Sequence, residues 1–390
     1  MCDSCRHRSA HPPWNKQFRY LAAVLLSTVL LCIGSATAWA EESIVLDLVR
    51  HGESAANAAG VLDNLAPGTG LTPTGEAQAT AIADLLKAAG PYAGTYAGEL
   101  IRAQETAAPL AEMLNMPVQI LPGLNEIPAG IFNGYPMDSL QGILYDLAPV
   151  AWVLGFPLVP DLGDLSVNGV TFDESFGGAV QTIYDNTVSA GGPTTDAAFS
   201  SEGAMAVWTM MNVKNPDFSV VLQQLLTTGQ LLPNGGQVVV EGSPGDWTLL
   251  SYAGTPVPQN PGLPTELFVD VRDLITAPQF AAYNIWEALG TGDPTTIANA
   301  IQSGVGEVGA ATVHFPLAVT QDLVGALGGG IQDLVANPAA ALNLDALLGG
   351  LNLGGLWGDL ANLLPTIATE FSALLPGELA AMVGAALALF

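Results

Sequence analysis

Basic residues and cysteines are scarce in this chain. Among 390 residues, 9 are Lys or Arg and 36 are Asp or Glu, which gives a formal net charge of −27. Such an anionic protein repels nucleic acid and anionic lipid, so we expect no nucleic-acid partner. The cysteines Cys2, Cys5 and Cys32 all lie near the N-terminus. The remainder therefore carries no disulfide, and its fold depends on hydrophobic burial. With no spaced His/Cys/Asp cluster, we expect no metal and no cofactor.

Residues 1–40 have the composition of a secretory signal peptide. A basic stretch precedes an apolar run over 20–34, and Ala38-Trp39-Ala40 supplies the small residues of a cleavage site. The alternative is an uncleaved membrane anchor, although the apolar run is short for that purpose. We therefore predict a secreted or cell-envelope protein. Cleavage after Ala40 leaves 5 basic and 35 acidic residues, a net charge of −30. Each remaining basic residue is then a candidate for a specific role.

Residues 41–258 alternate apolar strand patterns with helical patterns, which predicts an α/β fold. We expect three α/β/α layers around a mainly parallel sheet. The expected strands are 43–49, a short one near Thr95, 117–121, 195–200, 237–240 and 247–252. Helical spacing begins after Thr74, a plausible N-cap, and recurs over 101–114, where Pro109 implies a kink or a late start. In such folds ligands bind at the carboxyl ends of the strands.

Two further regions have less defined roles. Residues 132–192 carry helical patches at 137–154 and 172–187, which fit either a helical layer on the sheet or a lid over the site. Residues 259–390 are rich in Ala, Leu and Gly, approach a short repeat over 342–358, and contain Arg272 as their only Lys or Arg. We expect a largely helical region there. It could pack on the first domain, on a second copy of the chain, or on an apolar envelope layer.

The first motif with chemical content is Leu48-Val49-Arg50-His51-Gly52-Glu53-Ser54, followed by Asn57 and Gly60. A histidine at the end of a strand can present one ring nitrogen to an electrophile while a backbone carbonyl holds the other. Arg50 offers planar paired donors that suit phosphate. Gly52 lets the backbone approach a ligand without a Cβ clash. Alone, an Arg-His pair is weak evidence, because a structural or surface role explains it equally well.

Three later motifs follow in order. They are Leu71-Thr72-Pro73-Thr74-Gly75-Glu76-Ala77-Gln78-Ala79, Glu99-Leu100-Ile101-Arg102-Ala103-Gln104-Glu105-Thr106-Ala107 and Leu124-Asn125-Glu126-Ile127-Pro128-Ala129-Gly130. The first fits simple helix capping. The other two place Arg102 and Glu126 just beyond expected strands, at the ligand-binding edge of the sheet.

Together these motifs resemble the histidine phosphatase superfamily, which includes cofactor-dependent phosphoglycerate mutases and many phosphatases. The similarity covers about residues 44–255, and Asp173-Glu174-Ser175 resembles a later Glu-Ser step of the family. The resemblance implies that His51 becomes a phosphohistidine. It also implies that Arg50, Arg102 and Asn57 hold the phosphoryl oxygens, and that Glu126 donates and later accepts a proton. It requires no metal.

The chain departs from the family at a second histidine, which normally follows a late strand. The matching region reads Ala198-Phe199-Ser200-Ser201-Glu202-Gly203, so either Ser201 or Glu202 replaces that histidine. Ser201 is a tolerable donor. An ionised Glu202 at ~4 Å from a unit negative charge costs about 4 kcal/mol at an effective dielectric constant near 20. We therefore expect Glu202 to turn to solvent, to be protonated, or to act as a second acid.

Two functions follow from these observations. The first is an exported phosphomonoester hydrolase that acts on a small phosphorylated substrate. The alternative is a catalytically impaired phosphatase-like binding or structural module of the cell envelope. The alternative is favoured by the missing histidine, by the net charge, and by the apolar C-terminal region, which suits envelope contact or self-association.

Overall fold

The computed structural model describes residues 42–336. The predicted signal peptide, its three cysteines and the repeat at 342–358 lie outside these residues. The chain divides into two compact units, residues 1–317 and 318–390. The described part of the second unit, residues 318–336, is the end of helix α10. The domain boundaries expected from the sequence remain a prediction.

The first unit is built on a mixed sheet in the order β3-β2-β4-β1-β5-β6-β7. Neighbouring strands are parallel from β3 to β1, and the pairs from β1 to β7 are antiparallel. The strand bounds are β1 Ile44–Arg50, β2 Gly94–Ala97, β3 Val118–Ile120, β4 Thr195–Ser200, β5 Gln237–Ser243, β6 Asp246–Tyr252 and β7 Thr255–Pro256. The fold is thus α/β as expected, with the parallel half of the sheet carrying the motifs.

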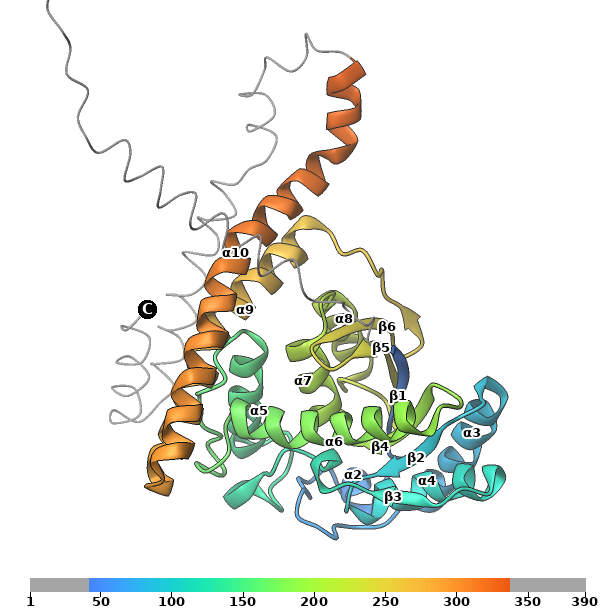
Figure 1. Cartoon of the computed structure of the whole chain (residues 1–390). Helices are drawn as coiled ribbons and strands as arrows, with labels where there is room; N and C mark the ends of the chain where they lie inside the picture. Colours follow the sequence, from blue (N-terminus) through green and yellow to red (C-terminus); the bar gives the residue numbers. More distant parts are fainter. Residues whose placement is uncertain (1–41, 337–390) are drawn as a thin grey trace, which may run out of the picture. The chain divides into compact units, whose positions relative to one another are not determined.

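Helices surround this sheet (Figure 1). Their bounds are α2 Ala55–Ala59, α3 Pro73–Ala89, α4 Ile101–Leu114, α5 Leu140–Val153, α6 Gly169–Ala190, α7 Glu202–Asn212, α8 Phe218–Thr228, α9 Leu263–Thr291 and α10 Pro294–Ala336. Two short 3₁₀ helices, η1 Pro122–Leu124 and η2 Gly130–Phe132, lie between β3 and α5. Helices α3 and α4 pack together beside β2, β3 and β4, whereas α6 and α7 pack on the strands through a separate apolar core.

Two details of the helices differ from expectation. The N-cap of α3 is Thr72, whose hydroxyl accepts from the Gly75 N–H, and not Thr74. Pro73 then occupies the first helical position, where a missing N–H costs nothing. Helix α4 begins at Ile101 and includes Pro109, so the late start is wrong. Helix α8 and strand β7 were not expected.

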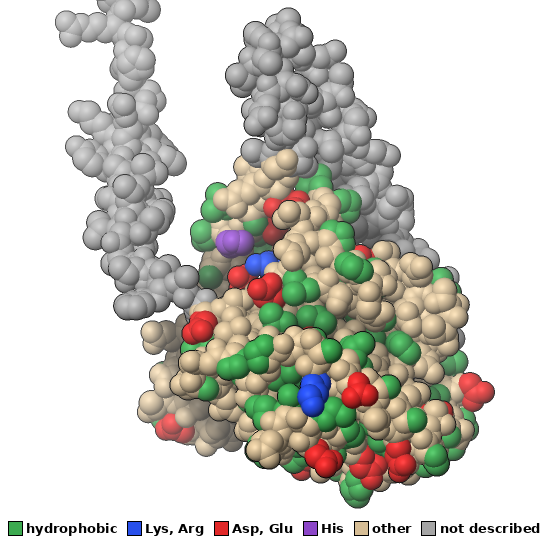
Figure 2. Space-filling model, turned by 90° about the vertical axis from the view of Figure 1, so that its right-hand side faces the viewer, with side chains coloured by type: hydrophobic (Ala, Val, Ile, Leu, Met, Phe, Trp, Pro, Cys, Tyr) green, Lys and Arg blue, Asp and Glu red, His purple; other side chains and the backbone are tan. Residues whose placement is uncertain are grey.

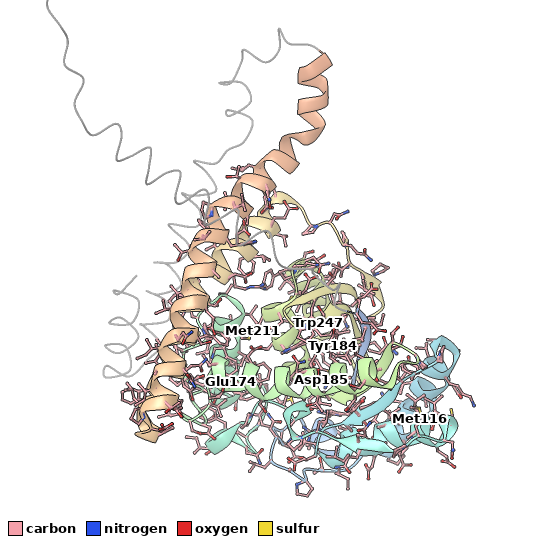
Figure 3. The ribbon with its side chains drawn as sticks, viewed as in Figure 1. Met116, Glu174, Tyr184, Asp185, Met211 and Trp247 are labelled. Atoms are coloured by element: carbon pink, nitrogen blue, oxygen red, sulfur yellow. The ribbon has the colours of Figure 1, made fainter. Side chains whose placement is uncertain are left out.

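The alternation of side chains along β1 separates two apolar cores. Leu46 and Leu48 belong to the larger core, whereas Val49 packs with Phe199 in the smaller one. In the larger core an aromatic row links α5, α6, α7 and β6 through Trp152, Phe172, Phe176, Trp208 and Trp247. Trp247 is labelled in Figure 3. Helix α6 is therefore a structural layer, while α5 also reaches the candidate site described below.

Helix α9 packs on the domain through buried polar groups. Arg272 donates from Nη1 to the carbonyls of Met210 and Val213, and Gln279 donates to the carbonyl of Gly155 at 2.8 Å. Of the three positions expected for the C-terminal region, packing on the first domain therefore holds for α9. Within residues 42–336, no helix combines the length and apolar character needed to cross a bilayer.

Several buried carboxyl groups make stability depend on pH. Burial raises the pKa of both Asp161 and Asp196 to about 6, and each has one carboxyl oxygen without a hydrogen-bond partner. A raised folded-state pKa stabilises the fold when the group is protonated, and this contribution is lost as pH rises through that pKa. The dense negative charge acts in the same direction.

We therefore expect the free energy of unfolding to fall by about 1 kcal/mol per buried carboxyl between pH 5 and pH 7.5. Denaturant unfolding at both pH values measures this change. Asp196→Asn should weaken the pH dependence, whereas Asp185→Asn, at an exposed position of α6 labelled in Figure 3, should leave it unchanged. Greater stability at pH 7.5 than at pH 5 would contradict the prediction.

Candidate active site

The sheet brings four expected site residues to one edge, because each follows a different parallel strand. His51 comes directly after β1, and Arg102 is the second residue of α4, the helix that follows β2. Glu126 lies in the loop after β3, and Glu202 begins the helix that follows β4. The carboxyl ends of parallel strands meet at one edge, which is where such folds bind ligands.

A cavity of about 250 Å³ opens at this edge. Arg50, His51, Asn57, Arg102, Glu126 and Glu202 all line it, so six of the seven expected site residues come together. Ser201 is not among the lining residues. The cavity is also lined by residues that the sequence did not indicate: Asp63, Asn64, Met137, Tyr145, Asp146, Leu225, Gln230 and Leu231.

The two ring nitrogens of His51 have fixed roles. Arg102 donates from Nε to His51 Nε2 at 2.9 Å, and a guanidinium can only donate. Nε2 must therefore carry a lone pair, and Nδ1 carries the proton that it donates to the Gly52 carbonyl at 2.7 Å. Burial lowers the pKa of His51 well below its usual value, and the charges of Arg102 and Arg50 lower it further. The imidazole is neutral, with a nucleophilic nitrogen directed at a guanidinium.

The remaining motif residues hold the His51 loop in place. Gly52 donates its N–H to Thr106 Oγ1 at 2.9 Å, and Glu53 donates its N–H to Gln78 Oε1 at 2.8 Å. A Cβ on Gly52 would lie 2.6 Å from the Gly75 carbonyl oxygen. Gly52 therefore allows this loop to pack closely against the start of α3. Three of the four motifs thus support the position of one histidine.

Arg50 is oriented by three acceptors on a single nitrogen. Its Nη1 donates to Glu202 Oε2 at 3.0 Å, to Gln230 Oε1 at 2.8 Å and to the Leu232 carbonyl. Its Nε is buried and has no hydrogen-bond partner among the residues that the structure describes. Burial lowers the pKa of Arg50, and the charges of Glu202 and Glu126 oppose this effect. An arginine remains charged in either case, so a buried cationic donor is free to bind an anion.

Arg102 is the second cation of the cavity. Besides His51, it contacts Asp63, with Nη1 2.6 Å from the Asp63 carbonyl oxygen and 3.6 Å from the carboxylate Oδ2. Asp63 in turn accepts from the N–H and the hydroxyl of Thr69. These contacts fix the plane of the guanidinium beside the imidazole.

Glu126 is held by backbone N–H groups at the start of α7. Its Oε1 accepts from Ile127 and Ala204 at 2.9 and 2.7 Å, and its Oε2 accepts from Gly203 at 3.1 Å. Burial raises the pKa of Glu126; its backbone hydrogen bonds and the charge of Arg102 act against that effect, and the charge of Glu202 adds to it. A Cβ on Gly203 would lie 2.8 Å from Glu126 Oε1, so glycine is needed there. The arrangement suits a group that exchanges a proton.

Glu202 and Ser201 have different surroundings. Ser201 is 2% exposed, and its Oγ has no hydrogen-bond partner in the described part of the chain. Glu202 lines the cavity, is 23% exposed, and forms an ion pair with Arg50. Of these two residues, Glu202 is therefore the one that lines the cavity. The expectation that it turns to solvent is wrong, because Arg50 and the N–H of Leu232 hold Oε2 inward.

Sequence patterns did not indicate that the segment between α8 and β5 contributes to the site. Asn234 donates from Nδ2 to the His51 carbonyl at 3.1 Å and to Asn57 Oδ1 at 3.3 Å. The antiparallel pairing of β5 with β1 explains this position. It pairs Gln237 with Val49 and brings the loop before β5 over the site. By contrast, Asp173-Glu174-Ser175 lies on α6 and does not line the cavity. Asp173 accepts from Asn212 instead, and Glu174 is labelled in Figure 3.

In the described part of the chain, the other basic residues, Lys87, Lys214 and Arg272, do not line the cavity. On the face shown in Figure 2, acidic side chains are scattered and basic ones are few. Across residues 42–336, no group of three or more His, Cys, Asp or Glu side chains is arranged to hold a metal ion. The cavity therefore places two arginines beside one neutral imidazole, together with four acidic side chains.

Comparisons with known proteins agree with this description. Residues 46–152 match the histidine phosphatase superfamily (branch 1). PE-PGRS family protein PE_PGRS11 of Mycobacterium tuberculosis is 54% identical over 295 residues, which are 74% of this chain and 49% of that protein. Adenosylcobalamin/alpha-ribazole phosphatase of Salmonella typhimurium is 45% identical over 83 residues, 21% of this chain and 40% of that protein. The chain spans about half the length of the curated relatives it matches.

Solved structures of low identity were also found. A mycobacterial glucosyl-3-phosphoglycerate phosphatase in complex with VO3 has a TM-score of 0.44 at 20% identity, covering 54% of this chain and all of that one. A phosphoglycerate mutase from Bacillus anthracis has a TM-score of 0.43 at 18% identity, covering 55% of this chain and 94% of that one.

The α/β fold, the buried histidine and the two arginines at one edge of the sheet agree with the family match over residues 46–152. The domain containing residues 46–152 belongs to the histidine phosphatase superfamily.

Proposed function

We propose that the chain is an exported phosphomonoester hydrolase that acts on a small phosphorylated substrate through a phosphohistidine at His51. The observation that carries the proposal is the position of the His51 Nε2 lone pair, which faces Arg102 in a cavity shared with Arg50 and Glu126. Export rests on the composition of residues 1–40 and is part of the proposal.

The reaction has two steps. His51 Nε2 attacks phosphorus, and the bond from phosphorus to the ester oxygen breaks as Glu126 gives that oxygen its proton. Water then attacks the phosphohistidine, the P–N bond breaks, and Glu126 takes a proton from the water. The raised pKa of Glu126 favours the protonated form that the first step needs. Phosphate is released, and both side chains return to their starting states.

Arg50, Arg102 and Asn57 hold the phosphoryl oxygens in this mechanism, because phosphoryl transfer depends mainly on positioning and charge stabilisation. The Arg102–His51 hydrogen bond must open as the phosphoryl group enters. Arg102 then moves its Nε–H from the imidazole lone pair to a phosphoryl oxygen. Asp63 keeps the guanidinium beside His51 during that exchange.

Trapping of the phosphoenzyme tests the proposal. The full chain is mixed rapidly with a ³²P-labelled aryl phosphate, quenched in alkali, and analysed by mass spectrometry. We expect a phosphoryl group on His51 that is stable in alkali and lost in acid. Turnover without label on His51, or label on a different residue, would overturn the mechanism.

A catalytically impaired binding module is the second candidate, and the Arg50–Glu202 ion pair favours it because a carboxylate already occupies one phosphate-binding group. Such a module would bind phosphate but form no phosphohistidine. Glu202→His would then be expected to create turnover in an otherwise inert protein. If the wild-type chain forms the phosphohistidine, this candidate is excluded.

A further inference from the structure

Glu202 places a carboxylate inside the proposed phosphate site. Its Oε2 lies 3.0 Å from Arg50 Nη1 and 3.3 Å from the N–H of Leu232. These two donors hold Glu202 Oε2 beside the place that an anion bound by the Arg50 guanidinium would occupy. Because Nη1 also donates to Gln230 and to the Leu232 carbonyl, Arg50 reaches a ligand through its other atoms. One of these, the buried Nε, has no acceptor among the described residues.

The ligand at this position therefore meets an acceptor and a donor. Glu202 can accept a hydrogen bond but repels a bare anionic oxygen, whereas the Arg50 guanidinium can only donate, and its charge favours an anionic oxygen. A phosphate group that carries one proton satisfies both, since its P–OH donates and its other oxygens accept. A fully ionised phosphate, or a sulfate, has no proton to donate. The site thus has the chemistry to distinguish two anions of nearly the same shape.

We propose that Glu202 makes the site specific for the singly protonated phosphoryl group, so that the substrate binds as the monoanion of a phosphomonoester. This inference rests on the proposed function, and it assigns to Glu202 a role in specificity that the family histidine could not fill. A histidine at this place donates to a phosphoryl oxygen; a glutamate accepts from one.

Other charged groups also face Glu202. Arg50 comes from β1, Glu126 from the loop after β3, Asp146 from α5 and Tyr252 from β6. Burial raises the pKa of Tyr252, so its hydroxyl remains neutral. Asp146 titrates close to the second ionisation of a phosphomonoester: desolvation by its surroundings raises its pKa to about 6, with smaller contributions from the Glu126 and Glu202 charges. That phosphate ionisation also has a pKa of about 6. An experiment must therefore separate titration of the ligand from titration of the protein.

Sulfate provides this separation, because it carries no proton at either pH 5 or pH 8. Titration calorimetry of the full chain with inorganic phosphate and with sulfate, at both pH values, measures the two effects. Inorganic phosphate keeps a P–OH at both pH values, so we expect it to bind more tightly than sulfate at pH 8 as well as at pH 5. We also expect phosphate to bind at least a hundredfold tighter than sulfate at pH 5. The change of sulfate affinity with pH reports the protein groups alone.

Two variants assign the preference to one carboxylate. Glu202→Gln should bind sulfate and phosphate within about threefold of each other at both pH values, because its amide can donate to a bare oxygen. Asp146→Asn removes the same charge from the same cavity, and it should keep the preference for phosphate. Glu202→His, which restores a donor, provides a second variant with the same expected loss of discrimination.

The outcomes distinguish this inference from the proposed function. If the wild type binds sulfate as tightly as phosphate, or if Asp146→Asn abolishes the preference as Glu202→Gln does, the inference is wrong. In that case phosphohistidine trapping can still succeed, and the hydrolase proposal stands. If neither anion binds and no phosphohistidine forms, both the inference and the proposed function fail.

Discussion

His51→Asn is expected to lower the turnover of an aryl phosphate by about 10⁴-fold or more, a loss typical of removing a catalytic nucleophile. No second histidine lines the cavity in the part of the chain that the structure describes. The neutral imidazole presents Nε2 because Gly52 and Arg102 fix its tautomer, and Asn has no equivalent nucleophilic nitrogen. Steady-state kinetics from pH 4.5 to pH 8 measure the loss.

The same pH series also tests whether the imidazole of His51 is neutral. Because burial and two arginines lower the pKa of His51, the wild type should remain active below pH 6, where an ordinary histidine is protonated. His314→Asn is the matched control, since His314 is exposed on α10. Turnover that survives His51→Asn at more than a few per cent, or that falls equally in His314→Asn, would contradict the assignment.

Strand and helix periodicity in the sequence predicted most of the sheet. The expected ranges 195–200 and 101–114 coincide with β4 and α4, because apolar alternation and helical spacing are local properties. Helix α8 was not expected, although its Ser, Gln and Thr side chains fall on one side of the helix, and none of its residues is buried. Thr72 was missed as a cap because two threonines flank Pro73, and only the position of the proline in the helix decides between them.

The site was predictable to the extent that its residues follow parallel strands. Arg50, His51, Arg102 and Glu126 come at strand ends, so their convergence follows from topology. Glu202 was ambiguous for a different reason. A one-residue shift at a strand end exchanges the buried and the cavity-facing positions, and only the start of α7 at Glu202 decides which residue faces inward. The contacts of Gln230 and Leu232 with Arg50 could not be inferred, because both residues lie about 180 positions from Arg50 in the sequence.

Glu126→Gln is expected to produce a loss that depends on the leaving group. For an alkyl phosphate, kcat/KM should fall by about 10²–10⁴-fold, the usual contribution of a general acid. For 2,4-dinitrophenyl phosphate, whose phenolate leaves without a proton, the fall should be less than about tenfold. The quantity kcat/KM is the informative one, because it reports the step that forms the phosphohistidine and excludes its later hydrolysis.

The pH dependence should change in the same variant. Wild-type kcat/KM for the alkyl ester falls as pH rises through the raised pKa of Glu126, because the carboxylate form has no proton to give. That fall should be lost for Glu126→Gln, whose amide does not titrate. The amide nitrogen also faces the Gly203 N–H, so thermal unfolding must accompany the kinetics. Equal losses for alkyl and dinitrophenyl esters in a folded variant would mean that Glu126 positions the phosphoryl group, and that the leaving oxygen receives its proton elsewhere.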